Sequence, residues 1–186
     1  MDIRDLDRRS LDVIDKLLAG ATEADLGRPT PCSGWTLADL LRHQISENHA
    51  FATAAREGAA PDWDGGTLGD DAFASYSRSV EDALTAFDEG TAPTMTIREF
   101  GDFPAAIALR MHLVDSVAHG WDIARALGQP YEPDSEALAE ALRFVANIPT
   151  EREPGGSFAP VVATPSTAPE LDRFLGLLGR DPGWVS

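Results

Sequence analysis

The segment 102–128, DFPAAIALRMHLVDSVAHGWDIARALG, constrains the fold most, because it predicts one long and largely buried helix. Asp102, two residues before Pro104, marks the start, since the fixed φ and missing N–H of proline suit a first helical turn. Gly128, followed by Pro130, marks the end, because glycine readily adopts the left-handed conformation found there. The residues between are mostly Ala, Leu, Ile, Val and Met. A helix that is apolar on most sides lies inside a helical assembly.

Two histidines and two aspartates interrupt this apolar composition. They are three, four and three positions apart, so they share one face at 3.6 residues per turn: His112, Asp115, His119 and Asp122. A solvent-facing surface is one explanation, but such surfaces usually carry long Lys, Arg and Glu side chains, whereas these groups are short and able to bind metal. Arg110 and Arg125 lie nearly opposite and offer another edge for contact with water. We therefore favour a polar functional site on this face.

Five other segments repeat apolar residues at helical spacing and are predicted helices. Their approximate ranges are 3–18, 36–57, 71–89, 134–147 and 169–178. Thr36 and Asp39 form a capping-box pair at the start of the second helix, and Asp134 can cap the fourth. Residues 94–101 are predicted as an extended connection. Residues 149–169 hold five prolines and two glycines and are predicted as an irregular segment.

These segments together predict an all-α protein with a single domain spanning residues 1–186. Four long amphipathic helices are expected to pack as a bundle over about residues 3–147. Residues 148–186 are expected to add an irregular wrap and a short helix. A chain of 186 residues is long enough to form its own core without disulfides.

Charge and cysteine content narrow the possible functions. With 15 basic and 31 acidic residues the net charge is −16, which argues against nucleic acid and anionic membranes as partners, because both need clustered positive charge. The sequence has no run of 18 apolar residues, so no membrane span is predicted, and no signal peptide is evident. Cys32 is the only cysteine, which excludes an internal disulfide. We expect a cytoplasmic protein, since a reducing compartment suits this cysteine content.

Asp115 and His119 have the spacing of a metal-binding pair. Residues four apart project from the same face of a helix, and a neighbouring bundle helix can supply a third ligand, for which His43 is the candidate. Two imidazoles and a carboxylate suit zinc, nickel or iron, and three protein ligands leave one position for water or substrate. The spacing also arises by chance, and a lone helical histidine is commonly structural. Both explanations remain open on spacing alone.

Three motifs resemble the DinB-like metal-binding bundles, and within them the branch that contains mycothiol-dependent maleylpyruvate isomerase. They are GWTLADLLRHQ at 34–44, D-x-x-x-HGWDIARALGQP at 115–130 and FLGLLGRDPGW at 174–184. The resemblance implies that His43, Asp115 and His119 hold a divalent metal, usually zinc. It also implies that the metal activates a low-molecular-weight thiol of the mycothiol type as its thiolate, which then adds to an electrophile.

The resemblance also suggests supporting roles and shows two departures. Glu47, His112 and Asp122 would orient the ligands or carry protons, although a structural or surface role explains each equally well. Asp115 stands where the isomerase pattern has glutamate. The sequence also contains no counterpart of the additional C-terminal domain of the isomerase, so maleylpyruvate is not the expected substrate.

The function expected from the sequence is therefore a divalent-metal protein, and more specifically a thiol-dependent transferase or isomerase. Its small-molecule partners would be the thiol and the electrophile. One alternative is a metal-binding or sensor bundle without catalysis, and another is a structural dimerisation domain with a vestigial site. Because such bundles often pair through helix faces, a homodimer is also considered.

Overall fold

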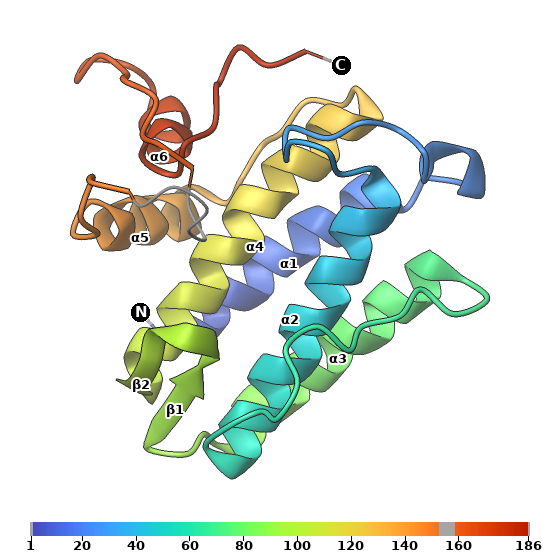
Figure 1. Ribbon diagram of the computed structural model, residues 1–186, viewed down its shortest axis with the longest axis vertical. Helices are drawn as coiled ribbons and strands as arrows, with labels where there is room; N and C mark the ends of the chain where they lie inside the picture. The colour runs from blue at the N-terminus through green and yellow to red at the C-terminus, as the bar shows by residue number, and fades with distance from the viewer. Residues whose placement is uncertain (1, 153–158, 186) are drawn as a thin grey trace.

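Four long helices form a bundle at the centre of the molecule (Figure 1). The computed structural model describes residues 2–152 and 159–185. The bundle helices are α1 (Ile3–Leu18), α2 (Leu37–Glu57), α3 (Ala72–Glu89) and α4 (Ala105–Leu127). Helix α1 packs against α3 and α4, and α2 packs against the same two helices. The predicted all-α bundle is confirmed.

Shorter elements surround the bundle. They are the 3-10 turns η1 (Glu23–Asp25) and η2 (Arg98–Phe100), the antiparallel strands β1 (Thr94–Ile97) and β2 (Gly101–Pro104), and the helices α5 (Ser135–Val145) and α6 (Glu170–Leu177). Helix α5 packs on α4 and α1, and α6 packs on α5, so both lie on the side of α4 away from α2 and α3 (Figure 1). Residues 153–158 of the predicted irregular segment lie outside the described residues.

The helix boundaries follow the capping residues in the sequence. The Asp39 N–H donates a hydrogen bond of 3.3 Å to Thr36 Oγ1, and the Thr36 N–H donates one of 3.0 Å to the Asp39 carboxylate. Gly128 ends α4 with a φ of 67°, in the left-handed region. The start of α2 and the end of α4 are therefore as predicted.

The start of α4 differs from the prediction. The segment 94–101, predicted as an extended connection, belongs to a hairpin that continues to Pro104. The Asp102 carboxylate accepts a hydrogen bond of 2.6 Å from Thr96 Oγ1, so it stabilises the hairpin and does not cap a helix. The prediction that the helix begins at Asp102 is wrong. Helix α4 begins at Ala105, directly after Pro104.

The bundle interior combines apolar packing with buried polar side chains. Trp121, Tyr76 and Phe87 are among the largest side chains that are fully buried. Polar residues from all four bundle helices are buried with them: Asp7, Ser10, Gln44, Asn48, Ser79, His112, Ser116 and Asp122. Buried polar groups destabilise a fold unless they are paired. Among the described residues the Ser10 hydroxyl has no hydrogen-bond partner. The partners of the others show which of them support a site and which support only the fold.

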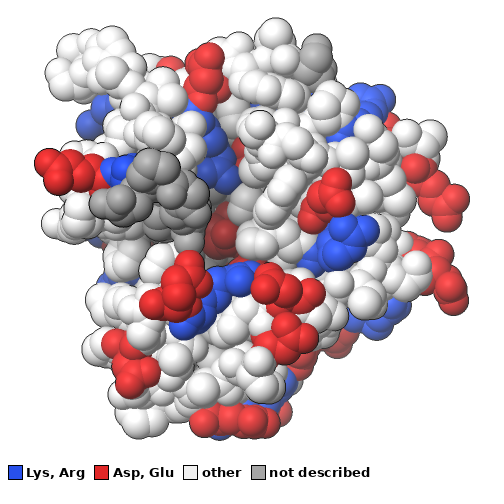
Figure 2. Space-filling model, viewed as in Figure 1, with Lys and Arg blue, Asp and Glu red and all other residues white. Residues whose placement is uncertain are grey.

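The surface carries charges of both signs. On the face shown in Figure 2, acidic and basic side chains are interspersed over the bundle helices. In the part of the chain that the structure describes, no helix has both the length and the apolar character needed to cross a bilayer.

The loop between α2 and α3 lies against α2 at Gly66. The Gly66 N–H donates a hydrogen bond of 2.9 Å to Ser46 Oγ. A Cβ at position 66 would lie 2.6 Å from the Ser46 backbone nitrogen and 2.7 Å from the Arg42 carbonyl oxygen. These distances are too short for any side chain, so glycine is required for the loop to lie this close to α2. The same loop presents the Trp63 carbonyl, which accepts a hydrogen bond of 2.8 Å from Arg98.

Gly66→Ala is expected to lower the free energy of unfolding by about 1–3 kcal/mol, because the added methyl group forces the loop or the α2 backbone to move. Urea unfolding followed by circular dichroism measures the change. Gly27→Ala is the matched control, since a Cβ at Gly27 meets no atom within 4 Å. Equal stability of the two variants would contradict this explanation of the loop.

Candidate metal centre

The three side chains predicted to bind metal come together between α2 and α4. His43 Nε2 lies 3.8 Å from Asp115 Oδ1, and His119 Nε2 lies 3.3 Å from the same oxygen. One ligand atom of each residue lies within 4.8 Å of the other two. The spacing of four residues places Asp115 and His119 on one face of α4. The packing of α2 against α4 brings His43 to that face.

The separations suit a small divalent ion. Ligand atoms bound about 2.0–2.1 Å from zinc at tetrahedral angles lie roughly 3.3–3.4 Å apart. The distances from Asp115 Oδ1 to the two histidine nitrogens, 3.3 and 3.8 Å, are close to this value. The side chains of His43 and Asp115 are 22% and 26% exposed, so the cluster is open on one side to solvent. Two imidazoles and one carboxylate thus fit a divalent metal with room for a further ligand.

The charges within the cluster depend strongly on one another. Burial disfavours the charged form of Asp115, but His119 and His43 outweigh it and hold the pKa of Asp115 well below its usual range. Burial likewise opposes a charged His119, but Asp115 and Asp122 outweigh it and raise the pKa of His119 well above its usual range. Asp115 is therefore anionic at neutral pH, as a metal ligand must be, whereas His119 holds a proton that a bound metal would displace. Gln44 Nε2 donates a hydrogen bond of 2.5 Å to Asp115 Oδ2, which leaves Oδ1 beside the histidines.

Asp122 holds the other ring nitrogen of His119. His119 Nδ1 donates a hydrogen bond of 2.9 Å to Asp122 Oδ2, and Asp122 is fully buried. Burial raises the pKa of Asp122, but the Arg180 charge and His119 outweigh it and lower that pKa to about 2. A carboxylate that accepts from Nδ1 fixes the imidazole so that Nε2 is available to a metal. Asp122 thus lies where the orienting role predicted for it requires.

Asp122→Asn is expected to weaken divalent-metal binding by about 10–100-fold, because a neutral amide is a poorer acceptor for the His119 N–H and orients the ring less firmly. Zinc titration in competition with a chromophoric chelator measures this change. Asp82→Asn is the matched control, since Asp82 contacts the exposed His49 at 2.9 Å and is not part of the cluster. If both variants bound zinc as the unmodified protein does, Asp122 would have no role in orienting His119.

Glu47 lies beside His43, but Arg98 holds it. Glu47 Oε1 is 3.8 Å from His43 Nδ1, which is beyond hydrogen-bond distance. Arg98 Nε donates a hydrogen bond of 2.8 Å to the same oxygen. Burial, and after it the negative charge of Asp115, raises the pKa of Glu47. Glu47 is therefore near the centre, with a carboxyl group that binds a proton more readily than an exposed one.

His112 shares a helix face with two of the candidate ligands but belongs to a different hydrogen-bond network. Its Nδ1 is 2.9 Å from both carboxylate oxygens of Asp7 on α1, and its Nε2 is 3.0 Å from Asn48 Oδ1 on α2. The ring also packs edge-on against Phe51 and Phe87. Both ring nitrogens are thus engaged by residues outside the candidate ligand set. The structure does not bring His112 together with the three ligands.

Two residues that sequence reasoning missed lie behind His119. The Cys32 thiol donates a hydrogen bond of 3.3 Å to Asp122 Oδ2, and its sulfur is 4.0 Å from His119 Nδ1. Arg180 Nη2 donates a hydrogen bond of 2.7 Å to the same oxygen of Asp122. Cys32 precedes α2 and Arg180 follows α6, so no helical spacing relates either residue to α4. The one sequence signal for Arg180 is its place in the motif FLGLLGRDPGW.

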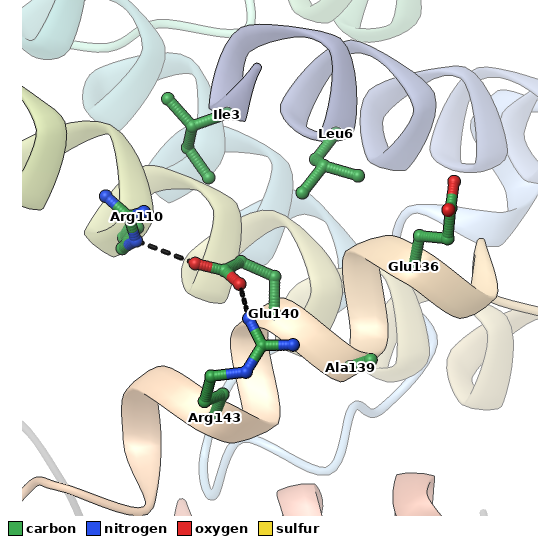
Figure 3. A pocket seen from close by; sticks show the side chains of 7 residues that line it. All are labelled: Ile3, Leu6, Arg110, Glu136, Ala139, Glu140 and Arg143. Carbon is green, nitrogen blue, oxygen red and sulfur yellow. Dashed lines mark hydrogen bonds and ion pairs between the residues drawn. The ribbon is translucent and has the colours of Figure 1, made fainter. Parts of the chain in front are cut away.

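The cavity drawn in Figure 3 is separate from this cluster. It lies between the start of α1 and the helices α4 and α5, with Ile3 and Leu6 in its wall. Glu140 is paired with both Arg110 and Arg143 beside it. None of the three candidate ligands lines the cavity. This cavity is therefore not part of the candidate metal centre between α2 and α4.

The protein is a four-helix bundle in which two histidines and an aspartate lie together between two helices. It is therefore a helical bundle with a candidate metal centre. The chain belongs to the mycothiol maleylpyruvate isomerase N-terminal domain family, whose model matches residues 8–124. This range includes His43, Asp115 and His119. Membership implies a mycothiol-related, DinB-like metal-binding domain.

The chain is also similar to two uncharacterised proteins of Mycobacterium tuberculosis, MT0763 of strain CDC 1551 / Oshkosh and Rv0738 of strain ATCC 25618 / H37Rv. Each is 30% identical over 179 residues, which is 93% of this chain and 94% of the relative. No solved structure gives a significant match.

Proposed function

We propose that this protein is a divalent-metal-dependent enzyme that activates a low-molecular-weight thiol of the mycothiol type and transfers it to an electrophile, as an S-transferase or an isomerase. The observation that carries the proposal is the partly exposed set of two histidines and one aspartate between α2 and α4. Family membership supports the thiol, because the family takes its name from a mycothiol-dependent reaction. Three protein ligands are typical of catalytic zinc sites, whereas structural sites have four.

In this proposal His43, Asp115 and His119 hold the metal, for which zinc fits best and nickel or iron would also fit. The metal supplies Lewis acidity, which favours the thiolate form of a bound thiol near neutral pH. Asp122 keeps His119 Nε2 directed at the centre by accepting the Nδ1 hydrogen bond of 2.9 Å. Gln44 keeps Asp115 Oδ1 directed at it by binding Oδ2.

Two further residues lie beside His43 and have roles in this proposal. Trp35, 37% exposed, packs its ring against that of His43 at a centroid distance of 5.2 Å and would shield one side of a bound ligand from water. Glu47, whose pKa is raised by burial, can hold or release a proton at its carboxyl group close to His43. Both residues would thus serve the thiol and not the metal itself.

The partners in this proposal are small molecules. The net charge of −16 gives no support to nucleic acid or anionic membrane as a partner, and we propose a cytoplasmic location, where low-molecular-weight thiols are kept reduced. A homodimer through helix faces remains a proposal that sedimentation analysis can test.

The test is a thiol-transfer assay on zinc-loaded protein, with mycothiol as the thiol and 1-chloro-2,4-dinitrobenzene as the electrophile. The thiolate sulfur bonds to the aromatic carbon as chloride leaves, and absorbance reports the thioether. We expect a metal-dependent rate above the uncatalysed reaction, which chelation removes, with little rate when cysteine replaces mycothiol. Bound metal without acceleration for any of a panel of electrophiles would favour a metal-binding bundle without catalysis.

A further inference from the structure

The chain that follows α6 returns to the metal centre. Gly179, with a φ of 79°, turns the backbone at the end of α6. The Arg180 N–H donates a hydrogen bond of 2.9 Å to the Leu175 carbonyl oxygen and so closes this turn. The Arg180 side chain extends to α4, where only 16% of it is exposed. Arg180 lies outside the range 8–124 that the family model matches.

Arg180 binds both carboxylate oxygens of Asp122. Its Nε lies 3.1 Å from each oxygen, and its Nη2 lies 2.7 Å from Oδ2. A planar guanidinium with several N–H donors fixes the plane of a carboxylate, which a single-point donor does not. The same Oδ2 accepts the hydrogen bonds of His119 Nδ1 and the Cys32 thiol. Three separate segments thus determine the position of one oxygen atom.

We propose that Arg180 is a positioning residue of the metal centre. By fixing the Asp122 carboxylate, it holds His119 in the orientation that presents Nε2 to the metal. Arg180 acts through Asp122 and does not touch the metal. This inference rests on the metal centre of the proposed function, but not on its thiol chemistry. The proposed role makes the segment after α6 part of the centre, although the candidate ligands all lie in α2 and α4.

The close packing around Asp122 explains why His119 would respond to the loss of Arg180. Arg180 Nη2 is also only 3.4 Å from His119 Nδ1, so the guanidinium fills the space beside the ring. Without it, the Asp122 carboxylate is free to turn and the His119 ring has room to rotate. A ligand that must be ordered when metal binds contributes less affinity than one held in place beforehand.

Cobalt titration of tag-free protein tests the proposal, because the visible absorption of bound Co²⁺ reports ligand geometry independently of enzyme activity. Arg180→Ala is expected to weaken Co²⁺ binding about tenfold or more and to alter its absorption spectrum, in the range seen for other outer-sphere changes. Arg180→Lys, which keeps the charge but not the planar pair of contacts, is expected to recover part of the affinity. Arg110→Ala is the matched control, since Arg110 of α4 pairs with Glu140 of α5, away from the cluster.

Each outcome decides the proposal. A folded Arg180→Ala protein with the affinity and spectrum of the unmodified protein would overturn it. If Arg180→Ala does not fold, Arg180→Lys decides, and an unchanged affinity and spectrum there would also overturn it. Failure of the unmodified protein to bind Co²⁺ or Zn²⁺ would overturn both the positioning role and the metal centre. Weakened binding in the Arg180 variants without any thiol transfer would support the positioning role while refuting the proposed catalysis.

Discussion

His119→Ala is expected to reduce the metal bound per chain from about one equivalent to a small fraction of that value, because the substitution removes one of only three protein ligands. His119 also contacts two carboxylates, one through each ring nitrogen. Its Nε2 lies 3.3 Å from Asp115, and its Nδ1 donates to Asp122 at 2.9 Å. Loss of the ring therefore removes a ligand and leaves both carboxylates without their shared partner. Elemental analysis after dialysis, together with zinc titration, measures the effect.

The matched control for this prediction is His49→Ala. His49 is on α2, is exposed, and contacts Asp82 at 2.9 Å outside the cluster. It tests whether removing any histidine lowers the metal content through nonspecific surface binding. Full metal occupancy in the His119 variant, or equal losses in the two variants, would refute the assignment of His119 as a ligand.

Asp7→Ala is expected to lower the free energy of unfolding by about 3–5 kcal/mol, since it leaves one member of a buried charged pair without its partner. Asp7 and His112 are both buried, and His112 Nδ1 is 2.9 Å from both Asp7 oxygens. Asn48 holds the other ring nitrogen and cannot replace the lost charge. Urea unfolding measures the change. Asp88→Ala is the control, because Asp88 forms an exposed pair with Arg8 and should contribute at most about 1 kcal/mol.

The same pair predicts a pH dependence of stability. Burial lowers the pKa of His112, but the Asp7 carboxylate, aided by the more distant Asp115 and Glu47, outweighs it and raises that pKa above 6.5. A raised pKa in the folded state gives stability that is fully present below the unfolded-state value of about 6.5. That stability is lost as the pH rises through the folded-state value.

The stability difference between the unmodified protein and Asp7→Ala should therefore be larger near pH ~6 than near pH ~9. Unfolding in urea with a chelator present, so that metal binding does not contribute, measures the difference at each pH. A difference that does not change with pH would contradict a charged His112 in the folded protein.

The bundle and the grouping of the three candidate ligands could be predicted because both depend largely on local spacing. Apolar periodicity marked the helices, and the Thr36–Asp39 pair and Gly128 marked two of their ends. The spacing of Asp115 and His119 predicted that these two candidate ligands share one face of α4. The prediction of His43 required in addition that its helix and α4 be neighbours, which a bundle allows and the resemblance to DinB-like bundles implies.

Other features depend on contacts between distant segments and could not be predicted from spacing. The Asp102 carboxylate binds Thr96 in the hairpin, so its apparent capping signal was misleading. His112 shares a helix face with the candidate ligands Asp115 and His119, yet it contacts the α1 residue Asp7, 105 positions away. Arg180 reaches Asp122 from beyond α6, a separation of 58 residues. No local pattern encodes such pairings.

The metal content of untagged protein tests the central claim most directly. Elemental analysis of the purified chain, before and after incubation with zinc followed by dialysis, should give about one equivalent of zinc, nickel or iron per chain. His43→Ala should lose most of this metal, because the substitution removes one of three proposed ligands. The variant should remain folded, since the His43 side chain is partly exposed. Protein that remains metal-free after incubation with each ion, or a His43 variant with full occupancy, would contradict the metal centre.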